Sequence, residues 1–126
     1  MRVLLADDKP EVRSALRLLL EQSLALCIAG EAADAMGLLA SARAAAPDLV
    51  LLDWELPGLA EASMPGLMAA LHAAAPRVAI IALSGLPGAR AAALAAGADA
   101  FVSKSDPPEA LLGALSAVLA KGRGTS

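Results

Sequence analysis

Five polar residues stand within two positions of the ends of short apolar runs of this sequence, and they include the residue types that phosphoryl chemistry uses. They are Asp7, Asp8, Asp53, Ser84 and Lys104. Each has an ordinary structural explanation alone, since an acidic pair suits a helix start and a lysine usually lies at the surface. Their shared position is more informative, because ligand sites in parallel sheets lie at the carboxyl ends of the strands. We therefore expect three carboxylates, a hydroxyl and an ammonium group in one small site.

The carboxylates of Asp7, Asp8 and Asp53 require a counter-charge if they share such a site. Two carboxylates about 4 Å apart repel each other by about 4 kcal/mol at an effective dielectric constant of about 20. A hard divalent cation offsets this repulsion, and Mg²⁺ prefers a few carboxylate oxygens together with water and phosphoryl oxygens. The three residues therefore indicate a Mg²⁺ site suited to metal-assisted phosphoryl chemistry.

Five short apolar runs, each expected to be a buried strand, alternate with segments long enough for helices. The runs are Val3–Ala6, Leu26–Ala29, Leu49–Leu52, Val78–Leu83 and Ala100–Val102. Their apolar residues stand at successive positions, which is typical of a parallel sheet covered on both faces. The alternation predicts an α/β fold, a doubly wound five-stranded parallel sheet with strand order 2-1-3-4-5. In that order the first and third strands are neighbours, which brings Asp7, Asp8 and Asp53 together.

Capping residues indicate where the first and last helices begin. Pro10 stands in the first turn of an expected amphipathic helix whose outer face carries Arg13. Asp106 is the expected cap of the last helix, which should end near Lys121. We therefore predict one domain over residues 1–121, followed by a tail or the start of a linker over residues 122–126.

The composition excludes several classes of protein. Hydrophobic residues make up 58% of the 126 residues and charged residues 18%, so an intrinsically disordered chain is excluded. The net charge of −3 argues against direct binding to nucleic acid. The longest uncharged run, Ala62–Pro76, is shorter than the roughly 20 residues of a membrane span. Cys27 is the single cysteine and is expected in the core, and we expect a cytoplasmic protein.

Four short motifs occur along the chain in a defined order. They are Asp7-Asp8, Asp53-Trp54-Glu55-Leu56-Pro57-Gly58, Ser84-Gly85 and Phe101-Val102-Ser103-Lys104. Together they resemble the receiver domain of bacterial two-component response regulators, and the resemblance covers Arg2 to about Lys121. The ordered set is much more specific than any one of its members. The resemblance implies a CheY-like, flavodoxin-like fold.

A Mg²⁺-dependent phosphoacceptor is what this resemblance implies. Asp53 would take a phosphoryl group from a phosphohistidine of a sensor histidine kinase. Asp8 would bind Mg²⁺ directly, Asp7 would bind it largely through water, and the backbone carbonyl of Glu55 would complete the protein ligands. The protein would then be a signalling switch rather than an enzyme, with only weak self-phosphorylation from small donors and autodephosphorylation.

The remaining motif residues would convert phosphorylation into a change of shape. Lys104 would pair with the aspartyl phosphate, and Ser84 would donate a hydrogen bond to a phosphoryl oxygen. Phe101 would be the switch aromatic that turns inward as Ser84 moves. The added charge of roughly −2 would be offset by Mg²⁺ and Lys104.

An expected partner surface lies on the face of the fourth helix, fifth strand and fifth helix. Its segment Leu86–Ala96 has Arg90 as its single charge, which leaves a poorly solvated surface. We expect this face to bind a second copy of the chain or an output domain. An output domain that binds DNA would make the whole protein a regulator of transcription.

Two positions depart from the family pattern. Glu61 stands eight positions after Asp53, where members usually have glycine, and Met64-Pro65-Gly66 follows later. The loop after Asp53 is therefore expected to carry an insertion, with Glu61 in solvent. Ser105 occupies the place after Lys104 where many members have proline.

Two other functions remain open from the residues. One is a phosphorylation-independent interaction module of the same fold, which the retained acidic residues and Lys104 disfavour. The other is a small aspartate and Mg²⁺ phosphohydrolase, which the lack of a second general acid or base near Asp53 disfavours. His72 is expected to be a surface residue of a helix rather than a phosphotransfer histidine.

Overall fold

Strands and helices alternate along the whole chain, as the sequence predicts. The structure is a computed structural model that describes residues 1–24, 26–58 and 64–124. Its strands are β1 (Arg2–Ala6), β2 (Cys27–Ala32), β3 (Leu49–Asp53), β4 (Ala79–Ser84) and β5 (Ala100–Ser103). Its helices are α1 (Pro10–Leu24), α2 (Ala35–Ala45), α3 (Met64–Ala74), α4 (Ala89–Ala95) and α5 (Pro108–Gly124).

The five strands form one parallel sheet in the order β2-β1-β3-β4-β5, which confirms the predicted topology. The register between β1 and β3 sets Ala6 beside Leu52. The aspartates that follow these two residues therefore reach the same edge of the sheet. The register between β4 and β5 sets Ser84 beside Ser103, one residue before Lys104. All five predicted polar residues thus lie at the carboxyl edge of the sheet.

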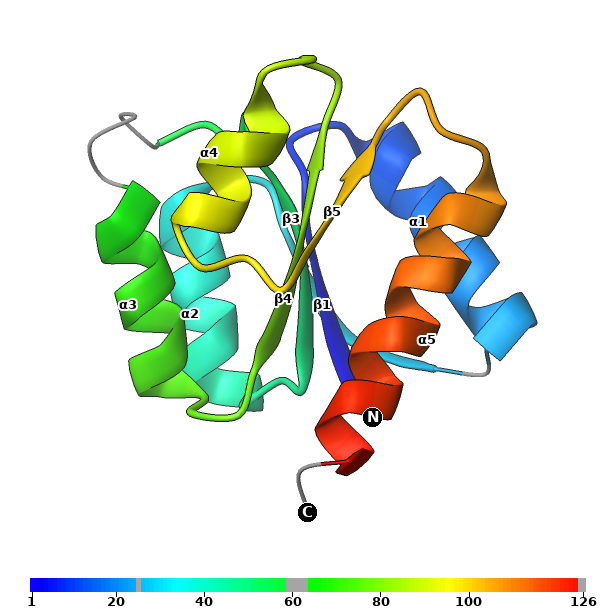
Figure 1. Ribbon diagram of the computed structural model, residues 1–126. Coiled ribbons are helices and arrows are strands. Elements are labelled where there is room, and N and C mark those ends of the chain that lie inside the picture. Colours follow the sequence, from blue (N-terminus) through cyan, green and yellow to red (C-terminus); the bar gives the residue numbers. More distant parts are fainter. Residues whose placement is uncertain (25, 59–63, 125–126) are drawn as a thin grey trace.

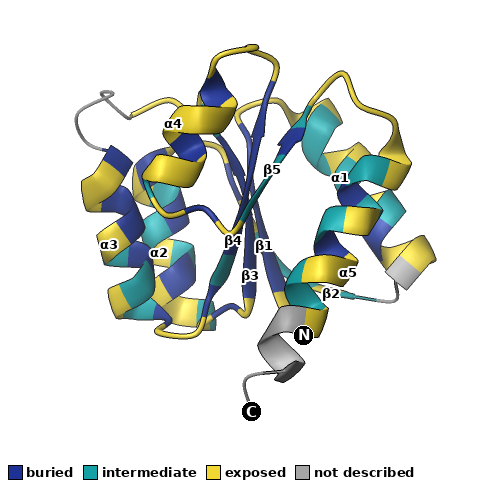
Figure 2. Ribbon diagram, in the orientation of Figure 1, coloured by how far each residue is buried: buried dark blue, intermediate teal, exposed yellow. Residues whose placement is uncertain are grey.

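The sheet lies between two layers of helices (Figure 1). Helices α2, α3 and α4 cover one face, and α1 and α5 cover the other. Successive residues of β1 enter the two cores in turn, with Val3 and Leu5 on the α1/α5 side and Leu4 and Ala6 on the opposite side. The central strands β1, β3 and β4 are buried over nearly their whole length (Figure 2). This two-sided burial explains why their sequences are apolar at successive positions.

The second strand differs from the prediction in length and burial. It begins at Cys27 and runs to Ala32, three residues beyond the predicted end at Ala29. Because β2 is at the edge of the sheet, three of its six residues are only partly buried and two are exposed. Cys27 is exposed, so the expectation that it packs in the core is wrong.

The last helix begins and ends later than expected. The Asp106 carboxylate accepts a hydrogen bond from the Ser103 backbone N–H at 3.2 Å, so it binds the end of β5 rather than capping α5. Helix α5 continues to Gly124 instead of ending near Lys121. Within the described ranges, the helices lack the combination of length and apolarity that crossing a membrane requires.

Candidate functional site

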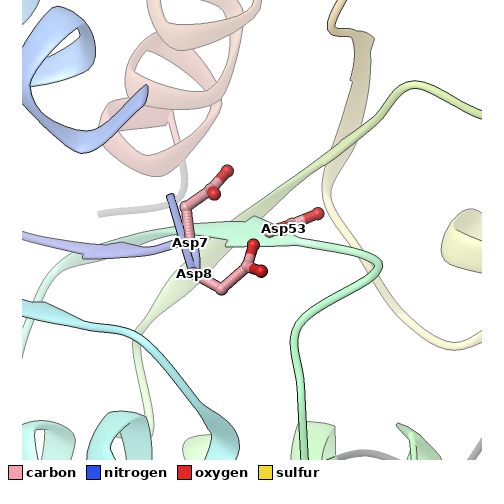
Figure 3. A group of neighbouring side chains, drawn as sticks. All are labelled: Asp7, Asp8 and Asp53. Carbon is pink, nitrogen blue, oxygen red and sulfur yellow. The ribbon is translucent and has the colours of Figure 1, made fainter. Parts of the chain in front are cut away.

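Three carboxylates meet at the carboxyl edge of the sheet (Figure 3). Asp7 and Asp8 directly follow β1, and Asp53 is the last residue of the neighbouring strand β3. One carboxylate oxygen from each residue lies within 4.8 Å of one from each of the others. Asp7 and Asp53 are buried, whereas Asp8 is exposed. The predicted acidic cluster is therefore present, with one carboxylate open to solvent.

Local hydrogen bonds orient the Asp7 carboxylate toward the site. Its Oδ1 atom accepts from the Lys9 backbone N–H at 2.9 Å, at the start of the turn into α1. Its Oδ2 atom accepts from the Lys104 ammonium group at 2.9 Å. Both oxygens of this buried side chain are thus engaged, so the carboxylate has a defined orientation.

Hydrogen bonds and the Lys104 charge also hold the Asp53 carboxylate in place. Its Oδ1 atom accepts from the Glu55 backbone N–H at 3.0 Å and lies 3.2 Å from the Lys104 ammonium nitrogen. Burial raises the pKa of the Asp53 carboxyl above its ordinary value. The Glu55 N–H opposes this increase, the charge of Asp7 adds to it, and the Lys104 charge opposes it. The carboxyl that would accept a phosphoryl group is therefore poorly solvated and lies beside another anion.

Lys104 connects the two buried aspartates. Its backbone N–H donates to the Ser84 carbonyl at 2.9 Å, which places the side chain over the ends of β1 and β3. Burial lowers the pKa of Lys104, but the hydrogen bond to Asp7 and the charges of Asp53 and Asp7 outweigh it and raise the pKa overall. The ammonium group is therefore a firmly held positive charge between two carboxylates.

Ser84 is fully buried, and its hydroxyl group is bound by a side chain that sequence reasoning did not consider. The hydroxyl donates to Glu55 Oε2 at 2.5 Å. The Gly85 backbone N–H donates to Glu55 Oε1 at 3.3 Å. The family resemblance implies a role for the backbone carbonyl of Glu55 but none for its side chain. The sequence does show an acidic residue two positions after Asp53, but the direction of its side chain depends on the conformation of the turn after β3.

Arg13 is a second residue whose role was missed. Its Nη1 atom donates to the Asp7 backbone carbonyl at 2.6 Å. Its Nε atom donates to Glu31 at 2.8 Å, and Arg17 also binds Glu31. The helical pattern placed Arg13 on the outer face of α1, but the end of β2 brings Glu31 to it. Arg13 thereby links the loop of the acidic cluster to the neighbouring strand.

The other residues singled out from the sequence lie as follows. Phe101 and Trp54 are half-buried and pack against the core on the α2/α3 side of the sheet. His72 lies on α3, and its Nδ1 atom is 2.9 Å from the Met68 carbonyl one turn earlier, so it is bound within its own helix. Glu61 lies outside the described residues, and α3 begins at Met64.

The donor atoms of this cluster fit a hard divalent cation. All three groups are carboxylates, and oxygen is the ligand that Mg²⁺ selects. Lys104 contributes one positive charge beside Asp7 and Asp53, so three ionised carboxylates leave a negative site. The exposed Asp8 side chain lies where a partly hydrated ion could reach it.

Comparisons with known proteins place this geometry in a family. The family model described as "Response regulator receiver domain" matches residues 3–116. Among curated proteins, the nitrate/nitrite response regulator protein NarL of Escherichia coli is 30% identical over 122 residues, covering 90% of this chain and 52% of NarL. The chain spans between 26% and 52% of the lengths of the curated relatives that it matches.

Solved structures agree with this assignment. A two-component response regulator of the LuxR family from Aurantimonas sp. is similar with a TM-score of 0.81 and 32% identity, covering 95% of this chain and 85% of that chain. RcsB from Salmonella enterica, bound to promoter rprA in the presence of phosphomimetic BeF3⁻, has a TM-score of 0.80 and 27% identity, covering 94% of this chain and 98% of that chain. The chain therefore belongs to the family of receiver domains of two-component response regulators.

Proposed function

We propose that this receiver takes a phosphoryl group onto Asp53 from a sensor histidine kinase, in a reaction that requires Mg²⁺. The observation that supports this most directly is the convergence of Asp7, Asp8 and Asp53 within 4.8 Å, with Lys104 bound to the two buried members. Such a site neutralises and positions a transferring phosphoryl group, which is the main requirement of this chemistry.

The transfer is a displacement at phosphorus. An oxygen of the Asp53 carboxylate attacks the phosphorus of a phosphohistidine, the new P–O bond forms, and the P–N bond breaks. The bonding electrons go to the imidazole nitrogen of the kinase. Lys104 stabilises the negative charge on the transferred group, and the Glu55 N–H holds Asp53 in position. A small acyl phosphate can replace the phosphohistidine as donor.

The proposed Mg²⁺ ligands are the side chains of Asp8, Asp7 and Asp53 together with the backbone carbonyl of Glu55. When bound, the ion supplies positive charge to the phosphoryl oxygens and reduces repulsion among the carboxylates. Asp8 is exposed and would bind the ion directly. Asp7, whose two oxygens already accept hydrogen bonds, would bind it largely through water.

The proposed output is a change of shape at the end of β4 and along β5. Ser84 would turn toward the phosphoryl group and Phe101 would turn inward, which alters the face formed by α4, β5 and α5. Leu86 and Leu94 on this face are 58% and 41% exposed. We propose that this face binds a second copy or an output domain. An output domain that regulates transcription fits these relatives, of which this chain spans 26% and 52%.

The test uses acetyl phosphate as the donor, with intact mass and Trp54 fluorescence as readouts. We expect a single labile phosphoryl adduct that needs Mg²⁺ and that the Asp53→Ala variant lacks. Failure of the wild type to form an adduct at saturating donor and Mg²⁺ would refute the proposal and favour a phosphorylation-independent interaction module. Rapid multiple turnover without an accumulating adduct would instead indicate a phosphohydrolase.

A further inference from the structure

We propose that the Glu55 side chain is a competitor of the phosphoryl group, because it occupies the hydrogen-bond donors at the end of β4 in the resting receiver. Phosphorylation of Asp53 must then displace Glu55 before Ser84 can bind the new group. The inference rests on the proposed function, and it adds a role for a side chain whose backbone alone was assigned to the site.

The contacts of Glu55 form a two-point attachment across the sheet edge. The backbone N–H of Glu55 donates to Asp53, so the turn after β3 is held by the proposed phosphoacceptor itself. From this turn the carboxylate reaches the end of β4, where one oxygen accepts from the Ser84 hydroxyl and the other from the Gly85 N–H. Glu55 thus joins the residue to be phosphorylated to the residue expected to respond.

Competition follows from the hydrogen-bonding capacity of Ser84. A hydroxyl group has one hydrogen to donate, and in this structure Ser84 donates it to Glu55. The Ser84 oxygen also accepts from the Leu86 N–H at 3.0 Å, which helps to hold the hydroxyl group in this position. The side chain is fully buried, so water cannot readily replace a lost partner. Ser84 must therefore leave Glu55 in order to donate to a phosphoryl oxygen.

The negative charge of Glu55 also opposes binding of the phosphoryl group at this place. A carboxylate and a phosphoryl group are both anionic acceptors, and the phosphoryl group adds roughly −2 charge. They would compete for the same donors and repel each other if both stayed. The Glu55 contact therefore stabilises the unphosphorylated state specifically. Its removal should make the phosphorylated state easier to reach.

A double-mutant cycle separates this hydrogen-bond competition from general repulsion by the Glu55 charge. The proteins are wild type, Glu55→Ala, Ser84→Ala and the double variant, each given Mg²⁺ and subsaturating acetyl phosphate. Intact mass gives the initial rate and the steady-state fraction of adduct. With Ser84 present, Glu55→Ala should raise the initial rate about three- to tenfold, and with Ser84→Ala the effect should fall below about twofold.

Two further variants sharpen the result. Glu55→Gln removes the charge but keeps an oxygen that accepts from Ser84, so its rate should stay closer to wild type than that of Glu55→Ala. Glu109→Ala removes one negative charge from the exposed first turn of α5 and should leave the rate unchanged. Equal effects of Glu55→Ala in both Ser84 backgrounds would overturn the competition and show a general charge effect.

A measurement without donor tests the contact itself. Amide hydrogen exchange followed by NMR should be several-fold faster at Gly85 in Glu55→Ala than in Glu109→Ala, because the Gly85 N–H loses its acceptor. Unchanged exchange would overturn the proposed attachment. If the wild type forms no adduct, the proposed function fails and the competition fails with it. If the wild type is phosphorylated but the cycle shows no coupling, the competition alone fails.

Discussion

The ammonium group of Lys104 lies 2.9 Å from the buried carboxylate of Asp7, although the two residues are 97 positions apart in the chain. This contact spans the sheet edge from β5 to β1 and passes beside Asp53, 3.2 Å from the same nitrogen. Two buried carboxylates thus share one cation. The site is held together by a charge that a divalent ion would partly replace.

Replacing Lys104 with methionine should destabilise the metal-free protein and strengthen Mg²⁺ binding. The variant leaves Asp7 and Asp53 without a cation, which should lower the free energy of unfolding by about 1–3 kcal/mol in chelator. Added Mg²⁺ should recover more stability in the variant than in wild type. Urea unfolding followed by Trp54 fluorescence measures both effects. Arg77→Met at an exposed position is the control, and an equal loss in the two variants would contradict the prediction.

Addition of Mg²⁺ should stabilise the wild-type receiver against unfolding. An ion that binds only the folded state adds about 2.7 kcal/mol at a concentration one hundred times its Kd. Asp8→Asn should weaken Mg²⁺ binding about tenfold or more without loss of the fold, because Asp8 is exposed. Thermal unfolding across a Mg²⁺ titration gives the apparent Kd. The same Kd in Asp8→Asn as in Glu109→Gln would remove Asp8 from the ligand set.

The parts of the site that were predicted and those that were missed differ in what determines them. Asp7, Asp53 and Lys104 each directly follow or end a strand, and parallel topology alone brings strand ends together. Glu55 lies in the turn that follows β3, where the direction of a side chain depends on backbone angles that the residue pattern does not determine. Arg13 looked solvent-facing because a helical pattern describes one helix and not the strand beside it.

Two features of the fold differ from the prediction for physical reasons. Cys27 lies in an apolar run like those of the central strands, but β2 is at the edge and lacks a neighbour on one side. Asp106 stands where the sequence predicts a helix cap, but its carboxylate accepts a hydrogen bond from the Ser103 N–H at the end of β5 instead. The place of β2 in the sheet decided the first outcome, and a backbone N–H three residues before Asp106 decided the second.

Replacing Ala46 with glycine should stabilise the protein. Ala46 is the C-cap of α2 and has φ of 45° and ψ of 66°, the left-handed conformation that L-residues adopt at a cost. Glycine avoids that cost but loses more conformational entropy on folding, so we expect a net gain of up to about 1 kcal/mol. Urea unfolding measures it. The control Ala44→Gly, within α2, should lose about 1 kcal/mol, and a loss at both positions would refute the argument.

Replacing Arg13 with alanine should weaken Mg²⁺ binding even though Arg13 is not a ligand. Its guanidinium group holds the Asp7 carbonyl at 2.6 Å, and the loop that carries Asp7 and Asp8 should be less ordered without it. We expect the apparent Kd for Mg²⁺ to rise by about three- to tenfold. Arg13→Lys should recover only part of this, because an ammonium group cannot bind the carbonyl and Glu31 in the same fork. An unchanged Kd in Arg13→Ala would show that the acidic loop is ordered without this contact.

The stability of the protein should depend on pH through Glu31, which Arg13 connects to the loop of the acidic cluster. The hydrogen bond from Arg17 is the main cause that lowers the pKa of Glu31 below its ordinary value, and Arg13 adds to it against the effect of burial. The Glu31 carboxyl therefore binds a proton more tightly in the unfolded chain than in the folded one. Its contribution to the free energy of unfolding is complete above the unfolded pKa of about 4.3. That contribution should be lost as the pH falls through the lower pKa of the folded state. The free energy of unfolding should therefore fall more for wild type than for Glu31→Gln between about pH 6 and pH 3. Parallel curves for the two proteins would show that the ion pairs with Arg13 and Arg17 do not contribute to stability.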